Sequence, residues 1–75
     1  MLVGGLALHN KIEELRNSFG YTQQQFADTL EVSRQTISSL EHGRYNPSLL
    51  LAFKISKVFH LPIEQIFWED NKEDL

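Results

Sequence analysis

The chain has no cysteine among its 75 residues, so it can form neither a disulfide bond nor a thiolate metal site. Three histidines are present, but they do not stand at the spacing of metal ligands, and we expect neither a metal nor another cofactor. No stretch approaches the roughly 20 consecutive apolar residues that span a bilayer, and we expect no membrane partner. These absences exclude several classes of site and leave a small cytoplasmic domain as the expectation.

Local signatures of catalysis are also missing. The sequence contains no glycine-rich phosphate loop and no motif that indicates a Ser/His/Asp or Cys/His set. The neighbouring carboxylates Glu13 and Glu14 diverge on a helix and are typical of a solvated face. We therefore do not expect an enzyme.

Basic residues are few, and the formal net charge is −3. The acidity is concentrated at the end of the chain, because residues 69–75 contain four acids and one lysine. Residues 34–57 contain four basic residues and one acid, a local surplus of +3. Such a surplus predicts moderate, salt-sensitive attraction to phosphate groups.

Two short helices joined by a tight turn are predicted between residues 22 and 42. Thr22 is a good N-cap and has Gln25 at the capping-box position, while Ser33 can cap a second helix. Apolar residues then recur at helical spacing in both segments, at Phe26, Ala27, Leu30, Ile37 and Leu40. Each helix therefore has one apolar side.

The opposite face of the second helix is polar and carries no acid. Gln35, Ser38, Ser39 and His42 lie there, and Arg34 stands at its flank. A surface selected for solubility usually carries Lys and Glu, whereas Arg, Gln and Ser hydrogen-bond base edges and phosphates. The face by itself leaves two readings open, a solvated surface helix and a helix that reads the major groove.

The spacing of these residues resembles the helix-turn-helix of phage-repressor (Cro/cI, or XRE-type) transcription regulators. The matching residues and segments, which extend the likeness to about residues 9–68, are Gln23, Ala27, Val32, Ile37, Leu40, Glu41-His42-Gly43-Arg44 and Asn46-Pro47-Ser48-Leu49. The resemblance implies an all-α, five-helix domain in which the second and third helices form the motif. One departure is Glu31, where the family commonly has a left-handed Gly. A non-Gly residue is strained in that conformation, so we expect either a relaxed turn or some loss of stability.

The remaining helices are predicted from apolar periodicity. A first helix should run from about Leu8 to Phe19 and end at Gly20. A nearly all-apolar fourth helix after the Ser48 cap should form the centre of the core. A fifth should begin after Pro62 and run to residue 67 or 68. Residues 8–68 are thus the expected domain, 1–7 a flexible segment with a short edge strand as the alternative, and 69–75 an acidic tail.

The resemblance also implies contacts for individual residues. Base edges are assigned to Arg34, Gln35, Ser38 and Ser39, since Arg suits guanine and Gln suits adenine. Phosphate contacts are assigned to Thr22, Gln23, Arg44, Tyr45 and Asn46. Arg16 and Glu41 are expected to form an ion pair joining the first helix to the end of the third.

The expected function is that of a sequence-specific regulator, a repressor, that binds a double-stranded DNA operator at the nucleoid as a homodimer. The dimer surface is expected on the last helix, at Ile63, Ile66, Phe67 and Trp68, with Trp68 folding back onto the domain as the alternative. A rival function is an antitoxin-like or anti-repressor module that binds another protein. Both hold if the domain binds DNA together with a toxin.

Overall fold

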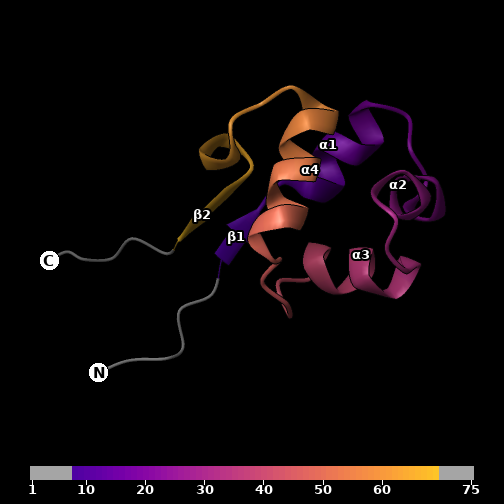
Figure 1. Cartoon of the computed structure of the whole chain (residues 1–75), viewed down its shortest axis with the longest axis horizontal. Coiled ribbons are helices and arrows are strands. Elements are labelled where there is room, and N and C mark those ends of the chain that lie inside the picture. Colours follow the sequence, from indigo (N-terminus) through magenta and orange to yellow (C-terminus); the bar gives the residue numbers. More distant parts are fainter. Residues whose placement is uncertain (1–7, 70–75) are drawn as a thin grey trace, which may run out of the picture.

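The computed structural model describes residues 8–69, which fold into helices packed beside a short two-stranded ribbon (Figure 1). The predicted segment 1–7 and most of the acidic tail lie outside these residues. In chain order the elements are β1 (Leu8–Asn10), α1 (Ile12–Ser18), α2 (Gln23–Leu30), α3 (Arg34–Glu41), α4 (Leu49–Phe59), the 3₁₀ turn η1 (Ile63–Gln65) and β2 (Phe67–Glu69).

The two predicted helices of the motif, α2 and α3, form with the predicted caps. The Thr22 hydroxyl accepts from the Gln25 N–H, and the Gln25 side chain accepts from the Thr22 N–H, which completes the capping box. Ser33 and Ser48 cap α3 and α4 in the same way, through single side-chain acceptors. The starts of α2, α3 and α4 therefore follow the local sequence signals.

Each of the four described α-helices is followed, within two residues of its last residue, by one with positive φ, namely Gly20 (81°), Glu31 (63°), Gly43 (71°) and His60 (58°). In each case the next N–H turns back to a carbonyl five residues earlier: Tyr21 to Arg16, Val32 to Ala27, Arg44 to Ser39 and Leu61 to Ser56. Two of the four positions are not glycine. The left-handed conformation predicted for Glu31 is confirmed.

The five-helix, all-α prediction is wrong at both ends of the domain. Residues 8–10 form strand β1 and not the first turn of a helix, and the predicted fifth helix is one 3₁₀ turn followed by strand β2. The strands pair antiparallel, with Leu8 opposite Glu69 and Asn10 opposite Phe67. Pairing of distant segments satisfies backbone groups that a short terminal helix would leave open.

The core lies where α1, α2, α3 and α4 meet. Its fully buried large side chains are Phe26, Ile12, Leu30, Ile37, Leu40, Ile55 and Ile66. Aromatic rings connect the helices, since Phe26 stacks on Phe59 with ring centroids 5.1 Å apart and Tyr21 lies against Phe26.

The central position predicted for α4 holds for only one of its faces. Leu51, Ala52, Ile55 and Phe59 are buried, but Leu49, Leu50 and Phe53 remain 68%, 66% and 49% exposed. Its first turn therefore presents apolar side chains to solvent.

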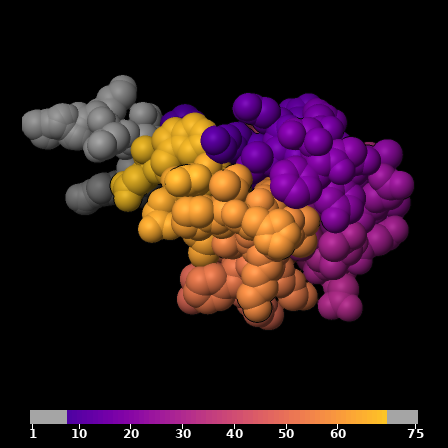
Figure 2. Space-filling model, turned by 90° about the horizontal axis from the view of Figure 1, so that it is seen from above, coloured from indigo at the N-terminus to yellow at the C-terminus, as the bar shows by residue number. Residues whose placement is uncertain are grey.

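Seen from above, the ribbon lies at one end of the molecule and α2 at the opposite end (Figure 2). Within residues 8–69 no helix has the length and apolar content needed to cross a membrane.

Candidate nucleic-acid interface

Helix α3 is anchored by its apolar side and exposes its polar side. Ile37 and Leu40 are completely buried, whereas Arg34 and Gln35 are exposed and Ser38 is partly exposed. Helical spacing divides the four predicted base-contact residues into two rows of i, i+4 pairs: Arg34 with Ser38, and Gln35 with Ser39.

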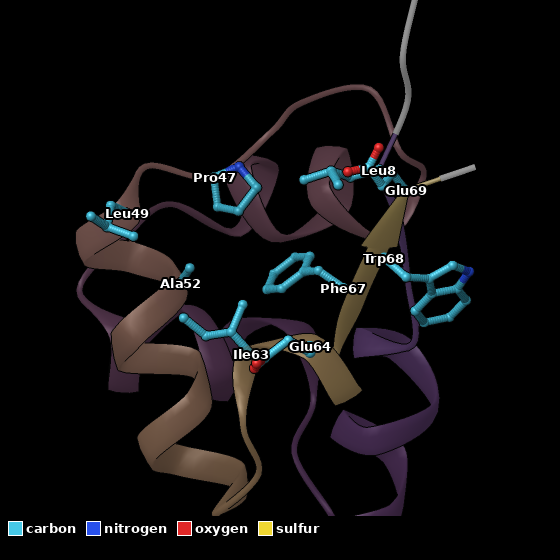
Figure 3. Close-up of a pocket in the computed structure, with 9 residues that line it drawn as sticks. All are labelled: Leu8, Pro47, Leu49, Ala52, Ile63, Glu64, Phe67, Trp68 and Glu69. Carbon is cyan, nitrogen blue, oxygen red and sulfur yellow. The ribbon is translucent and has the colours of Figure 1, made fainter. Parts of the chain in front are cut away.

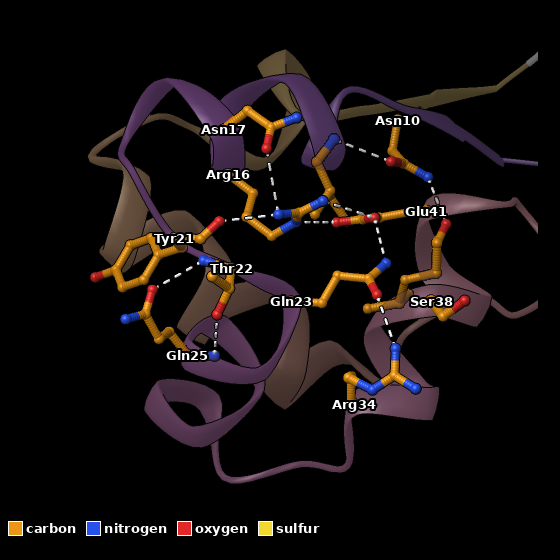
Figure 4. Close-up of polar contacts among 12 residues, drawn as sticks. Asn10, Arg16, Asn17, Tyr21, Thr22, Gln23, Gln25, Arg34, Ser38 and Glu41 are labelled. Carbon is orange, nitrogen blue, oxygen red and sulfur yellow. Dashed lines mark hydrogen bonds and ion pairs between the residues drawn. The ribbon is translucent and has the colours of Figure 1, made fainter.

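The row that begins with Arg34 is tied to the start of α2. Arg34 Nη1 donates to Oε1 of Gln23 at 3.2 Å, and Nε2 of Gln23 donates to Oε1 of Glu41 at 3.0 Å (Figure 4). The Glu41 carboxylate accepts hydrogen bonds and cannot donate them, so it turns the amide nitrogen of Gln23 toward itself and the carbonyl toward Arg34. Gln23 therefore lies between the core and the exposed guanidinium.

Glu41 is held in turn by Arg16. The Arg16 Nε and Glu41 Oε2 atoms are 2.6 Å apart, and the two side chains are 9% and 2% exposed. Arg16 also donates to the carbonyl of Tyr21. This ion pair joins α1 to the end of α3, where losing one partner leaves the other charge buried.

Asn10 makes a contact that the sequence did not indicate. Its side-chain Nδ2 donates to the Leu40 carbonyl at 2.8 Å, and its Oδ1 accepts from the Ile12 N–H at 3.0 Å. The Asn10 side chain thus pairs with a backbone N–H at the start of α1 and with a backbone carbonyl near the end of α3. The predicted first helix began at Leu8 and so included Asn10, which is why this capping role was not predicted.

The phosphate-contact residues predicted in the motif gather in two places. Thr22 and Gln23 lie at the amino end of α2, in an open polar hollow of about 770 Å³ that Arg34 also lines. Arg44, Tyr45 and Asn46 are exposed in the loop after α3, where the bond from Arg44 N–H to the Ser39 carbonyl fixes the start of the loop. Gln23 bonds both the first and the last residue of α3, whereas Tyr45 lies beside Gln35 and Ser39, so the two places flank α3 along different rows of side chains.

Three of the four predicted dimer residues, Ile63, Phe67 and Trp68, line one groove, whereas Ile66 does not. Ile66 is completely buried and Phe67 is 7% exposed, so both belong largely to the core of the chain itself. Ile63 is partly buried, and Trp68 is 46% exposed and stacks on His9 across the ribbon at 6.1 Å. Ile66 caps η1 just before β2 and packs into the core, so its burial does not fit the predicted place in a dimer surface.

An apolar groove lies beside these residues, between α4 and β2. It has a volume of about 770 Å³, and its lining includes Leu8, Pro47, Leu49, Ala52, Ile63 and Phe67, with Glu64 and Glu69 as its charged residues. Figure 3 shows the Phe67 ring pointing into the groove and Trp68 pointing away from it. Pro47 and Leu49 were not predicted at an interface.

Known proteins match nearly all of the described residues. The model of the helix-turn-helix family HTH_3 matches residues 12–66. The HTH-type transcriptional regulator YgzD of Bacillus subtilis is 49% identical over 61 residues, which cover 81% of this chain and 92% of YgzD. The regulator MJ0272 of Methanocaldococcus jannaschii is 48% identical over 66 residues, 87% of this chain and 100% of that protein.

Solved structures agree on the fold. The restriction-modification controller protein C.AhdI of Aeromonas hydrophila aligns with a TM-score of 0.66 and 24% identity over 73% of this chain and 83% of its own.

A further sequence relative, a competence pilus inhibition repressor of Acinetobacter baylyi, is 40% identical over 53 residues, 71% of this chain and 48% of that repressor. The chain belongs to the helix-turn-helix family of DNA-binding transcription regulators.

Proposed function

We propose that the protein represses transcription by binding a specific double-stranded DNA operator, with α3 in the major groove. The observation that carries this proposal is the acid-free outer face of α3, where Arg34 and Gln35 are exposed while Ile37 and Leu40 anchor the helix from below. Side chains of this kind form bidentate hydrogen bonds to base edges, each worth about 1–3 kcal/mol of discrimination.

The two rows on α3 contact different bases. Arg34, directed by Gln23, reads a guanine, and Ser38 follows it along the groove. Gln35 reads an adenine, with Ser39 one turn further. The shorter serines contribute through water.

Phosphate contacts come from two places that flank α3. Thr22 and Gln23 present the amino end of α2, whose N–H groups and dipole favour an anion. Arg44 and Asn46 present the loop that follows α3. A DNA backbone strand held at each place fixes the position of α3 without adding sequence information.

A second copy of the chain completes the recognition. One eight-residue helix reads too few bases to select a site in a genome, and two-fold dimers on half-sites roughly 34 Å apart solve this. The groove between α4 and β2 is apolar and none of the four base-contact residues lines it. An interface there leaves both recognition helices free.

The groove is also suited to a two-fold interface, in which the same patch meets itself. Leu49 projects at its edge with 68% of its surface exposed, and the groove beside it has room for a side chain of that size. Each Leu49 then inserts into the partner's groove, with Ile63 beside it and Phe67 as the floor. Trp68 lies at the rim and contributes less.

The repressor role is supported by the relative from Acinetobacter baylyi, which is named a repressor. Because a bound dimer covers about one turn or more of duplex, occupation of a promoter is sufficient to block polymerase.

Selection of bound sequences from a random duplex library, followed by salt titration, tests the proposal. We expect a two-fold motif and an observed affinity that falls linearly on a log–log plot against salt. A chain that enriches no motif and shows no salt dependence would instead support the protein-interaction module, whose partner would use the groove.

A further inference from the structure

Helix α3 carries a small pocket that the contacts above do not use. The pocket has a volume of about 250 Å³ and is lined by Ser33, Gln35, Thr36, Ser39 and Tyr45. We call it the Tyr45 pocket. Two of its residues, Gln35 and Ser39, form the second row of proposed base contacts, so the pocket opens beside the reading face.

Tyr45 reaches this position because the chain reverses direction after α3. Gly43 adopts a φ of 71°, and the Arg44 N–H bonds the Ser39 carbonyl, which turns the loop back along the helix. The other side of Tyr45 lines a second hollow with Leu30, Val32 and Leu50. The ring is 43% exposed and stands as a wall between the two hollows.

The chemistry of the pocket does not suit a phosphate group. None of its five residues is charged. The Thr36 N–H is taken by Ser33 Oγ at 3.1 Å, and the Ser33 and Thr36 hydroxyls lie 2.9 Å apart and bond each other. Phosphate is held best by cations, and no cationic side chain lines the pocket.

Its walls suit an apolar group at the edge of a base. The Ser33 and Thr36 hydroxyls bond each other, and the tyrosine ring and the aliphatic stem of Gln35 supply apolar surface for contact. The group of this kind in the major groove is the C5-methyl of thymine.

We propose that Tyr45 is a specificity-determining residue, whose ring closes a pocket that receives the methyl group of one thymine in each half-site. The inference rests on the proposed DNA-binding function and deepens it. It moves Tyr45 from the phosphate contacts, where the sequence pattern predicts it, to the base contacts.

The test removes one methyl group from the DNA and one ring from the protein. In the selected operator each thymine is replaced singly by deoxyuridine, which keeps every hydrogen-bonding group and loses only the methyl. For the wild-type chain we expect one position per half-site where deoxyuridine weakens binding about fourfold, the value of one buried methyl group.

Two variants decide whether Tyr45 is responsible. Tyr45→Phe keeps the ring, so we expect the thymine preference to persist; in Tyr45→Ala thymine and deoxyuridine should bind equally. Arg44→Ala is the matched control from the same loop, and it should weaken both operators while the preference stays. Circular dichroism melts verify that each variant folds.

The possible failures are distinct. A wild-type chain that selects no motif overturns the proposed function itself. A chain that selects a motif but shows no methyl preference, or keeps the preference in Tyr45→Ala, overturns only the assignment of Tyr45. If Tyr45→Phe weakens binding equally to all operators and Tyr45→Ala keeps the methyl preference, Tyr45 contacts a phosphate and not a base.

Discussion

Gln23 accepts a hydrogen bond from Arg34, with its Oε1 atom 3.2 Å from Arg34 Nη1, while its Nε2 atom donates to the buried Glu41. A residue predicted to hold a phosphate is thus also the support of a residue predicted to read a base. The amide has a second N–H, so the two roles are compatible.

Gln23→Met should separate those roles, because methionine has a similar length and no amide. We expect affinity for the selected operator to fall roughly 3- to 10-fold, the value of about one hydrogen bond. Preference at the base facing Arg34 should weaken, since an untethered guanidinium samples more rotamers.

Its control is Gln24→Met, one residue along, whose amide bonds Asp28 on the exposed side of α2. That variant should bind as the wild type does. Repeating the sequence selection with both proteins checks the outcome, and equal weakening on all sequences by Gln23→Met would leave Gln23 a phosphate contact alone.

Loss of one partner from the Arg16–Glu41 pair should be costly. Arg16→Met leaves the Glu41 carboxylate buried without its cation, and we expect the free energy of unfolding to fall by about 3–5 kcal/mol. Arg16→Met combined with Glu41→Leu should recover much of that loss. Urea denaturation measures both, and a double variant no more stable than Arg16→Met would contradict the expected cause.

Glu31→Gly should stabilise the fold, because Glu31 has a φ of 63° that glycine adopts without strain. After the added chain entropy of glycine, we expect a gain of about 0.4–1 kcal/mol in the free energy of unfolding. The contact from Lys54 to Glu31 is 3.5 Å long and exposed, so its loss costs little.

The chain has its own matched site for this test. His60 ends α4 at a φ of 58°, so His60→Gly should give a similar gain, while Glu31→Ala keeps the strain and should give none. Thermal melts compare the three. A lower midpoint for Glu31→Gly would show that chain entropy outweighs the strain.

Base and phosphate contacts should respond differently to substitution. Gln35→Ala should flatten preference at one or two base positions and cost about 1–3 kcal/mol on the best operator. Arg44→Ala should weaken all sequences alike and reduce the slope of log affinity against log salt by about 0.9. Selection and salt titration measure these effects, and an unchanged motif with Gln35→Ala would place the reading face elsewhere.

The dimer surface can be tested with two neighbouring leucines. Leu49 and Leu50 are almost equally exposed, at 68% and 66%, but only Leu49 lines the groove between α4 and β2. Leu49→Glu should give a folded monomer that binds operator weakly, because the charge would enter an apolar interface. Leu50→Glu should remain dimeric. Sedimentation measures the oligomeric state of both variants. If both are monomers, or both are dimers, the interface does not lie in this groove.

The helix-turn-helix could be predicted because its signals are local. Thr22, Ser33 and Ser48 cap helices through hydrogen bonds that reach three residues along the chain, and Ile37 and Leu40 set the buried side of α3 through spacing alone. These features need only neighbouring residues to form. The strained turn at Glu31 was expected from the family resemblance, because the family commonly has Gly at this position.

Tertiary structure decided whatever depends on distant segments. Residues 8–10 and 67–69 are short and apolar enough to suit either a helix or a strand, and only their pairing across the domain made them a ribbon and buried Ile66. The amide orientation of Gln23 depends on Glu41, and the Tyr45 pocket depends on a loop that returns along α3. The sequence by itself determined where α2, α3 and α4 begin and which side of α3 is buried, through caps and period. The fold decided which side chains support the exposed side of α3, because their partners lie many residues away.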